Sequence, residues 1–316
     1  MGVISAPREA KLDHDASDAP RSAACLNCGT ALAGPFCSQC GQRDVPPYPS
    51  VRELVVDAFW ELSGWDGRFA STVRALATKP GRLTLDFLEG RRARYISPLR
   101  LYLMASLIYF VAAAAAPDLK TADGKPANLG LRITPTGSTK AEQVANAAGS
   151  AMANQEAIST ADRDSILAAV NKAPPIMRPF FQKVLLDPKG LKRSLTEAMP
   201  KMLFALLPVF AAIVALFYRN RKYPEHLYFA IHLQAFVFIA LTIAALFKFT
   251  RITPLAVAAS GLCLLSIPVY ATMAFRKTYG DTLPTTLLKG IGIGAIYGTV
   301  SIAAFITTLF VVSRFG

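Results

Sequence analysis

Long apolar runs in the C-terminal half constrain the fold of this chain most strongly. Residues 201–218 and 227–240 form two such runs, and the short loop between them contains Arg219, Arg221 and Lys222. A helix of about 20 apolar residues crosses the roughly 30 Å hydrocarbon core of a bilayer. Basic loops stay preferentially on the cytoplasmic side. The sequence therefore predicts a transmembrane hairpin whose turn faces the cytoplasm.

The same pattern predicts five membrane-spanning helices in all. Their expected bounds are 97–116, 200–218, 227–247, 254–275 and 286–312, and the last four form a four-helix membrane bundle over 200–312. Composition agrees, because 53% of the 316 residues are hydrophobic, against about 45–50% in an ordinary soluble domain. The predicted fold class is an all-α membrane protein.

The charge balance points to the membrane surface rather than to nucleic acid. The chain has 34 Lys and Arg against 21 Asp and Glu, a formal net charge of +13. In a soluble protein this excess would suggest a nucleic-acid partner, but here basic clusters flank the apolar runs, at 91–94, 219–222 and 276–277. Such flanks attract anionic lipid headgroups. The expected partners are the lipid bilayer and its anionic headgroups at the basic loops.

These three basic segments also predict the orientation. A cytoplasmic N-terminus places all three inside and leaves the C-terminus outside, as the preference of basic loops for the cytoplasm requires. The insertion of residues 117–199 is then extracytoplasmic, and its length prevents its charges from deciding the orientation.

Four of the five cysteines are crowded into residues 25–44. Cys25 and Cys28 form one C-x-x-C-G turn, and Cys37 and Cys40 form a second. Two thiolate pairs at this spacing are typical of a four-sulfur structural metal site, with zinc preferred where no redox role is indicated. No apolar leader precedes them, so we expect a cytoplasmic segment with reduced thiols. The sequence predicts a zinc ribbon that binds one structural Zn²⁺ per chain.

The other N-terminal segments are expected to be simpler. Residues 1–24 are polar and lack hydrophobic periodicity, which predicts a disordered tail. Residues 45–96 begin with a proline-rich linker, and residues 51–62 then place apolar side chains along one face of a helix. We therefore expect amphipathic helices at the membrane interface, or packed against the bundle.

Polar residues within the predicted spans are candidates for function, because they are costly in a bilayer. Glu225 and His232 lie seven residues apart, on one face of the third span, whereas His226 points elsewhere. Tyr297 lies in the glycine-rich fifth span. The simpler interpretation is interhelical hydrogen bonding at the histidine and close helix packing at the glycines. The alternatives are a proton or substrate relay, or a metal ligand.

The chain resembles a bacterial family of uncharacterised multi-span membrane proteins with an N-terminal zinc ribbon. The resemblance lies in CLNCG…FCSQCGQ at 25–42, TVRAL…PGR…FLEGRRARYISPLRLY at 72–102, LKRSLTEAMPKMLFALLPVF at 191–210 and YPEHLYFAIHLQAF at 223–236. It implies the bacterial inner membrane and a domain of unknown function. The family often has a further histidine where this chain has Gln234, which weakens a histidine-only metal site in the third span.

Two functions are consistent with these features. The first is a binding, scaffold or regulatory protein whose cytoplasmic zinc ribbon engages a protein or lipid partner. The second is a small transporter or channel that uses the Glu225/His232 face and the glycine-rich fifth span. An enzyme is less expected, because the sequence contains no nucleotide-binding loop, nucleophile elbow or H-E-x-x-H motif.

Overall fold

The computed structural model describes residues 22–44, 68–117, 178, 182–183 and 188–315. Residues 1–21 of the expected disordered tail, the expected amphipathic helix at 51–62 and most of the expected insertion lie outside the described residues. Within the described part of the chain the secondary structure is helical, apart from two isolated bridges in the cysteine-rich segment.

Five helices are long and apolar enough to cross a membrane, which confirms the predicted fold class. They are α4 (Pro98–Ala115), α8 (Pro188–Phe217), α9 (Tyr223–Phe247), α10 (Thr253–Tyr279) and α11 (Leu283–Phe315). Proline occupies the first turn of α4, α9 and α10, where the missing N–H costs no helical hydrogen bond and the fixed φ favours initiation. Helices α8 and α11 are longer than one bilayer crossing requires.

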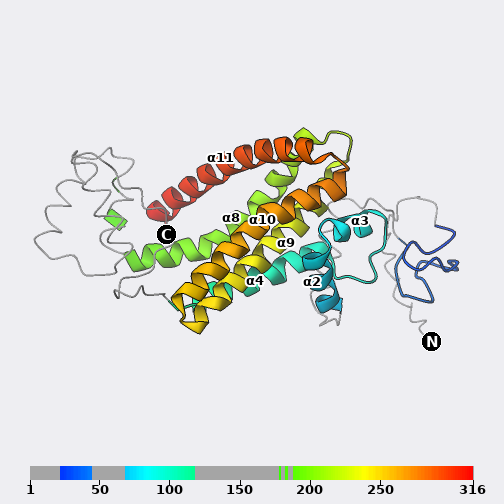
Figure 1. The fold of residues 1–316 in the computed structure, drawn as a ribbon, viewed down its shortest axis with the longest axis horizontal. Helices are drawn as coiled ribbons and strands as arrows, with labels where there is room; N and C mark the ends of the chain where they lie inside the picture. Colours follow the sequence, from blue (N-terminus) through cyan, green and yellow to red (C-terminus); the bar gives the residue numbers. More distant parts are fainter. Residues whose placement is uncertain (1–21, 45–67, 118–177, 179–181, 184–187, 316) are drawn as a thin grey trace, which may run out of the picture.

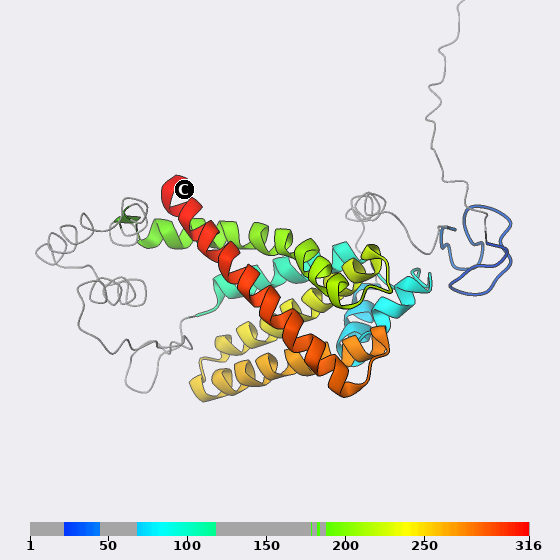
Figure 2. The same cartoon turned by 90° about the horizontal axis from the view of Figure 1, so that it is seen from above.

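Helix α9 is the centre of the bundle. It packs against α4, α8 and α10, whereas α11 lies on the outside against α8 (Figures 1 and 2). Of the 18-residue apolar windows in these helices, the one in α9 is 61% buried and the one in α11 is 6% buried. Helix α9 is apolar around its whole circumference, as expected of a helix surrounded by others. The polar residues Glu225, His226 and His232 on α9 are accordingly buried within the protein.

The glycines of the fifth span do not share one packing role. A Cβ added to Gly292 would come within 3.0 Å of the Phe217 ring, so this glycine permits close contact with α8. A Cβ added to Gly290, Gly294 or Gly298 would have no described atom within 4 Å. The expected small-residue packing is thus found at Gly292 alone among these four residues.

Two short helices cover one end of the bundle. Helix α2 (Arg68–Thr78) leads into α3 (Arg82–Leu88), and α3 packs against both α9 and α10. Gly81, at the N-terminus of α3, has a φ of 73° and lies against α10, where an added Cβ would be 2.9 Å from the Ala274 carbonyl oxygen. Only glycine fits this backbone conformation and this contact without strain. The cysteine-rich segment lies at the same end (Figures 1 and 2).

Candidate metal centre and polar core

Each cysteine pair lies in a tight turn closed by a backbone hydrogen bond. The Gly29 N–H donates to the Cys25 carbonyl at 2.8 Å, and the Gly41 N–H donates to the Cys37 carbonyl at 2.9 Å. Gly29 and Gly41 have φ values of 78° and 70°, in the left-handed region that glycine occupies without a steric penalty. The glycine after each second cysteine is what allows the two turns to form.

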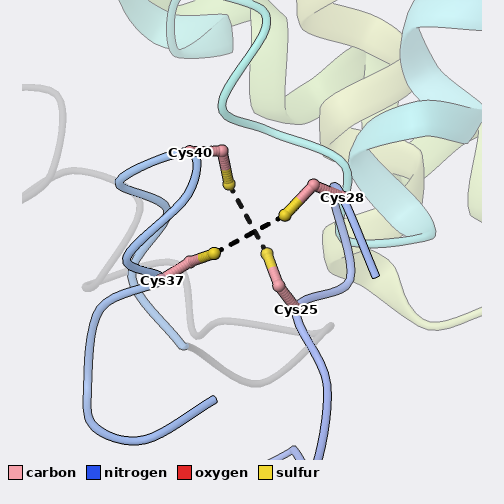
Figure 3. A group of neighbouring side chains, drawn as sticks. All are labelled: Cys25, Cys28, Cys37 and Cys40. Atoms are coloured by element: carbon pink, nitrogen blue, oxygen red, sulfur yellow. Dashed lines mark hydrogen bonds between the residues drawn. The ribbon is translucent and has the colours of Figure 1, made fainter. Parts of the chain in front are cut away.

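The two turns bring four sulfur atoms together (Figure 3). The Sγ atoms of Cys25 and Cys40 are 3.6 Å apart, those of Cys28 and Cys37 are 3.5 Å apart, and all four lie within 4.8 Å of one another. A tetrahedral site with metal–sulfur bonds of about 2.3 Å has sulfur–sulfur separations of about 3.8 Å. A disulfide would need about 2.05 Å, and all four cysteines are free. The cluster fits a four-thiolate metal site.

The environments of the thiols differ. Burial raises the pKa of Cys25 to about 11. The pKa of Cys28 is lowered to about 6, chiefly by hydrogen bonding from Thr30, whose hydroxyl lies 3.3 Å from Cys28 Sγ. A bound metal ion would take all four sulfurs as thiolates and so displace their protons. Four sulfur ligands complete a tetrahedral shell and leave no position for water or substrate.

The cysteine-rich segment, residues 22–44, is docked on the turn formed by residues 90–93. The Gln42 side chain makes three hydrogen bonds to the backbone of this turn. Its Nε2 donates to the Gly90 carbonyl at 2.8 Å, and its Oε1 accepts from the N–H groups of Arg92 and Ala93, both at 3.1 Å. Leu26 lies on the same turn, because a Cβ added to Gly90 would be 2.6 Å from Leu26 Cδ1.

On its other side, this turn is held by a buried carboxylate. Asp86 of α3 is 5% exposed. Its Oδ1 accepts from the Nε and Nη2 atoms of Arg91 at 3.1 and 2.7 Å, and Arg82 Nε lies 3.1 Å away. Its Oδ2 accepts from the Tyr95 hydroxyl at 3.0 Å. Burial, followed by the hydrogen bond to Asp86, raises the pKa of Tyr95, so Tyr95 stays the protonated donor. Arg91 also pairs with Glu89.

Helix α3 connects this cluster to the centre of the bundle. Thr84 Oγ1 lies 3.0 Å from Nδ1 of His232 on α9, and both residues are buried. The Phe87 ring packs on the His232 ring, with centroids 5.4 Å apart, and on the Tyr228 ring at 6.0 Å. His232, predicted from the sequence as a polar residue within a span, therefore contacts a short helix that precedes the first span.

The four candidate polar residues of the spans each have a different partner. Besides the pair of His232 with Thr84, they form three contacts: Glu225 Oε2 with Arg221 Nη1 at 3.0 Å, His226 Nδ1 with the Tyr279 hydroxyl at 2.8 Å, and the Tyr297 hydroxyl with Gln234 Nε2 at 3.3 Å. Glu225 also accepts from the Lys222 N–H at 3.1 Å and so caps α9. Glu225, His226 and His232 lie on α9 and Tyr297 lies on α11, and the structure keeps the four residues in separate pairs.

Three residues of this arrangement were not predicted from the sequence: Gln42, Thr84 and Asp86. Their partners are 4 to 148 positions away in the chain, and the distant contacts of Gln42 and Thr84 leave no trace in local periodicity. One signal was present for Asp86. An acidic residue followed within nine positions by Arg91, Arg92, Arg94 and a tyrosine could have indicated a carboxylate bound by arginines.

The fold and the cluster define a helical membrane protein with a four-cysteine metal-binding module. Residues 66–110 match the model of a family described as a protein of unknown function (DUF3667). This match covers α2, α3, the 90–93 turn and most of α4. Together with the cysteine cluster, it fits an uncharacterised family with an N-terminal zinc ribbon. No curated protein and no solved structure matches the chain.

Proposed function

We propose that this protein is an integral protein of the bacterial inner membrane with a binding, scaffold or regulatory role. Its cysteine-rich segment is a zinc ribbon on the cytoplasmic side, where it engages a protein partner. The observation that carries this proposal is the docking of a complete four-sulfur cluster, by Gln42 and Leu26, on one end of an apolar helical bundle. A filled tetrahedral shell favours a structural surface module over catalysis.

Zinc is the metal that this donor set favours. Four sulfur ligands in a tetrahedron suit zinc or iron, and nothing else in the described residues suggests electron transfer. The segment has few buried apolar residues, and a module without a core of its own depends on a metal for its fold. The zinc in this proposal is therefore structural, with one ion per chain.

The cytoplasmic placement rests on the distribution of basic residues. Arg221 donates to the Thr278 carbonyl at 3.3 Å, which brings the turn between α8 and α9 against the end of α10. Gly81, next to α3, also lies against Thr278. The basic segments at 91–94, 219–222 and 276–277 thus share the end of the bundle that carries the cysteine cluster. Short basic loops are enriched on the cytoplasmic side, and they would attract anionic headgroups there.

A photo-crosslinking residue at Phe36 tests the binding role. Phe36 lies beside Cys37 and is 61% exposed. We expect crosslinks at this position to one defined protein in intact cells, and we expect Cys40→Ser to abolish them. Ala33, also exposed, is the matched control position within the same segment. A Phe36 crosslinking pattern identical to that of Ala33, or unchanged by Cys40→Ser, would count against a partner that recognises the ribbon.

One observation favours the alternative, a small transporter or channel. The Nε2 atom of His232 is buried and has no hydrogen-bond partner among the described residues. A buried imidazole nitrogen of this kind can bind a water molecule or take up a proton. In this alternative, the route uses the Glu225/His232 face of α9 and the glycine-rich α11, which meets α9 at the contact of Tyr297 with Gln234.

A further inference from the structure

Both cysteine turns of the ribbon contact the same short segment, residues 90–93. Leu26, inside the first turn, lies against Gly90. Gln42, directly after the second turn, makes its three hydrogen bonds to the backbone at 90, 92 and 93. The two contacts can form together only when the two cysteine turns keep one fixed distance and orientation.

Little besides a metal ion can hold the two turns in that relation. Among the described residues of the ribbon, the buried apolar side chains are Cys25 and Cys37. Its backbone pairing consists of two isolated bridges, Ala24 with Ala31 and Phe36 with Arg43, and each bridge lies within one turn. Between the two ends of the ribbon, the Ser22 N–H donates to Asp44 Oδ2 at 3.0 Å. Between the turns themselves, the four sulfurs are the link that these residues show, so the relative position of the turns depends on the ion that binds the sulfurs.

The 90–93 segment, on which the ribbon is docked, is connected to the core of the bundle. Arg91 and Tyr95 bind Asp86 of α3. Thr84, half a turn from Asp86, pairs with His232 of α9 at 3.0 Å. The Arg68 guanidinium of α2 donates to the Ala93 carbonyl at 3.2 Å. A change in the 90–93 segment is therefore transmitted to α3 through ion pairs and hydrogen bonds, not through a flexible linker.

We propose that Gln42 is a positioning residue that couples metal binding in the ribbon to the packing of α3 against α9. The metal fixes the relative position of the two cysteine turns. Gln42 and Leu26 can then bind residues 90–93 together, and this bound segment positions Arg91 and Tyr95 around Asp86. The inference rests on the metal site of the proposed function but on no partner of the ribbon. Because coupling between two equilibria is reciprocal, docking must strengthen metal binding as much as metal binding strengthens docking.

Hydrogen exchange of the full-length protein in lipid nanodiscs tests this coupling. We expect removal of zinc with a chelator to raise amide exchange over 90–96 by about tenfold, and over 82–88 by a smaller factor, as local protection is lost. Exchange in the buried parts of α9 and α10 should not change. Re-addition of zinc should restore the original rates.

Gln42→Ala, compared with Gln39→Ala, separates docking from metal binding. Gln39 belongs to the same ribbon and is exposed. In zinc-loaded Gln42→Ala protein, exchange over 90–96 should already match that of the zinc-free wild type, and chelation should raise it no further. In competition with a chelator, this variant should bind zinc about tenfold more weakly, by the same factor as its loss of protection. Gln39→Ala should behave as the wild type in both measurements.

Two further variants distinguish the loss of docking contacts from misfolding of the ribbon. Gln42→Glu keeps the acceptor for the N–H groups of Arg92 and Ala93 but loses the donor to Gly90, so we expect an intermediate effect. Leu26→Ala removes only the apolar contact and should act in the same direction as Gln42→Ala. The proposal is overturned if chelation leaves exchange over 90–96 unchanged, or if Gln42→Ala and Gln39→Ala are indistinguishable. A separate measurement of zinc content shows whether the metal site itself has failed.

Discussion

At the scale of single residues, one carboxylate joins α3 to the segment that leads into the first span. Asp86 accepts from Arg91 and Tyr95 and pairs with Arg82, all while 5% exposed. Three donors satisfy a charge that would otherwise be costly to bury. This residue fixes the geometry of the chain between α3 and the first span.

Asp86→Asn should therefore destabilise the protein. The amide loses the charge that attracts two arginines and can keep only part of the hydrogen bonding. The arginines are partly exposed and can turn to water, so we expect a loss of about 1–3 kcal/mol in the free energy of unfolding. Chemical unfolding in detergent measures it. Glu89→Gln is the matched control, since Glu89 is half-exposed and binds the same Arg91. Equal losses in the two variants would contradict a structural role for Asp86.

A second prediction at this scale follows from the hydrogen bond between His232 and Thr84. If the imidazole serves to join α9 to α3, then His232→Gln keeps a hydrogen-bonding group facing Thr84 and should leave folding and function nearly unchanged. His232→Leu and Thr84→Val should each destabilise by about 1 kcal/mol, and the double variant by little more than either single one. The free energies of unfolding of the wild type, the two single variants and the double variant complete this double-mutant cycle.

The same variants discriminate between the two proposed functions. A His232→Gln protein that is folded, present at normal levels and unable to complement a deletion strain would support the transporter. The reason is that an amide cannot exchange a proton near neutral pH as imidazole does. Additive losses of stability in His232→Leu and Thr84→Val would show that the two side chains, 3.0 Å apart, contribute no interaction energy to the folded state.

At the scale of helices, length and apolar content predicted what the chain forms, but not which helix is central. Five apolar runs gave five spans. Helices α9 and α11 look alike by this measure, yet α9 is surrounded by other helices and α11 is the outermost. Long-range packing decides which helix is surrounded, and the apolar content of a helix carries no information about that packing. The glycine spacing of α11 likewise predicted close packing that the described residues show at Gly292 only.

The contact of α3 with α10 depends on Gly81. Gly81→Ala would place a Cβ 2.9 Å from the Ala274 carbonyl oxygen, whereas Gly280→Ala would meet nothing within 4 Å. Both glycines have a positive φ, 73° and 79°, so both alanines carry the same backbone strain. We expect Gly81→Ala to cost about 2 kcal/mol more than Gly280→Ala because of the added overlap. Thermal unfolding of the two variants tests this, and equal midpoints would contradict the close contact of α3 with α10.

At the scale of the whole molecule, the metal module and the basic turns share one end of the bundle (Figures 1 and 2). The C-x-x-C-G spacing was enough to predict the cysteine cluster, because all four ligands lie within 16 consecutive residues. The docking of that cluster could not be predicted. It depends on Gln42 bonding to a turn 48 to 51 positions further along the chain.

Reporter fusions test the orientation. Fusions after Asp44 and at Asn220 should report the cytoplasm, whereas fusions within residues 137–154 and after Gly316 should report the outside. This pattern follows from five crossings and a basic end that stays inside. A cytoplasmic signal from within 137–154 would mean that α4, the shortest of the five helices, does not cross the membrane.

Metal analysis of the intact protein is the strongest test of the four-thiolate site. Protein extracted from membranes without added zinc should contain one zinc ion per chain, as a four-thiolate structural site requires. Cys25→Ser or Cys40→Ser should remove the ion while the variant chain stays in the membrane fraction, and Cys263→Ser, outside the cluster, should keep it. Freshly prepared wild-type protein with much less than one metal ion per chain, or with the four cysteines joined as disulfides, would rule out a structural zinc site.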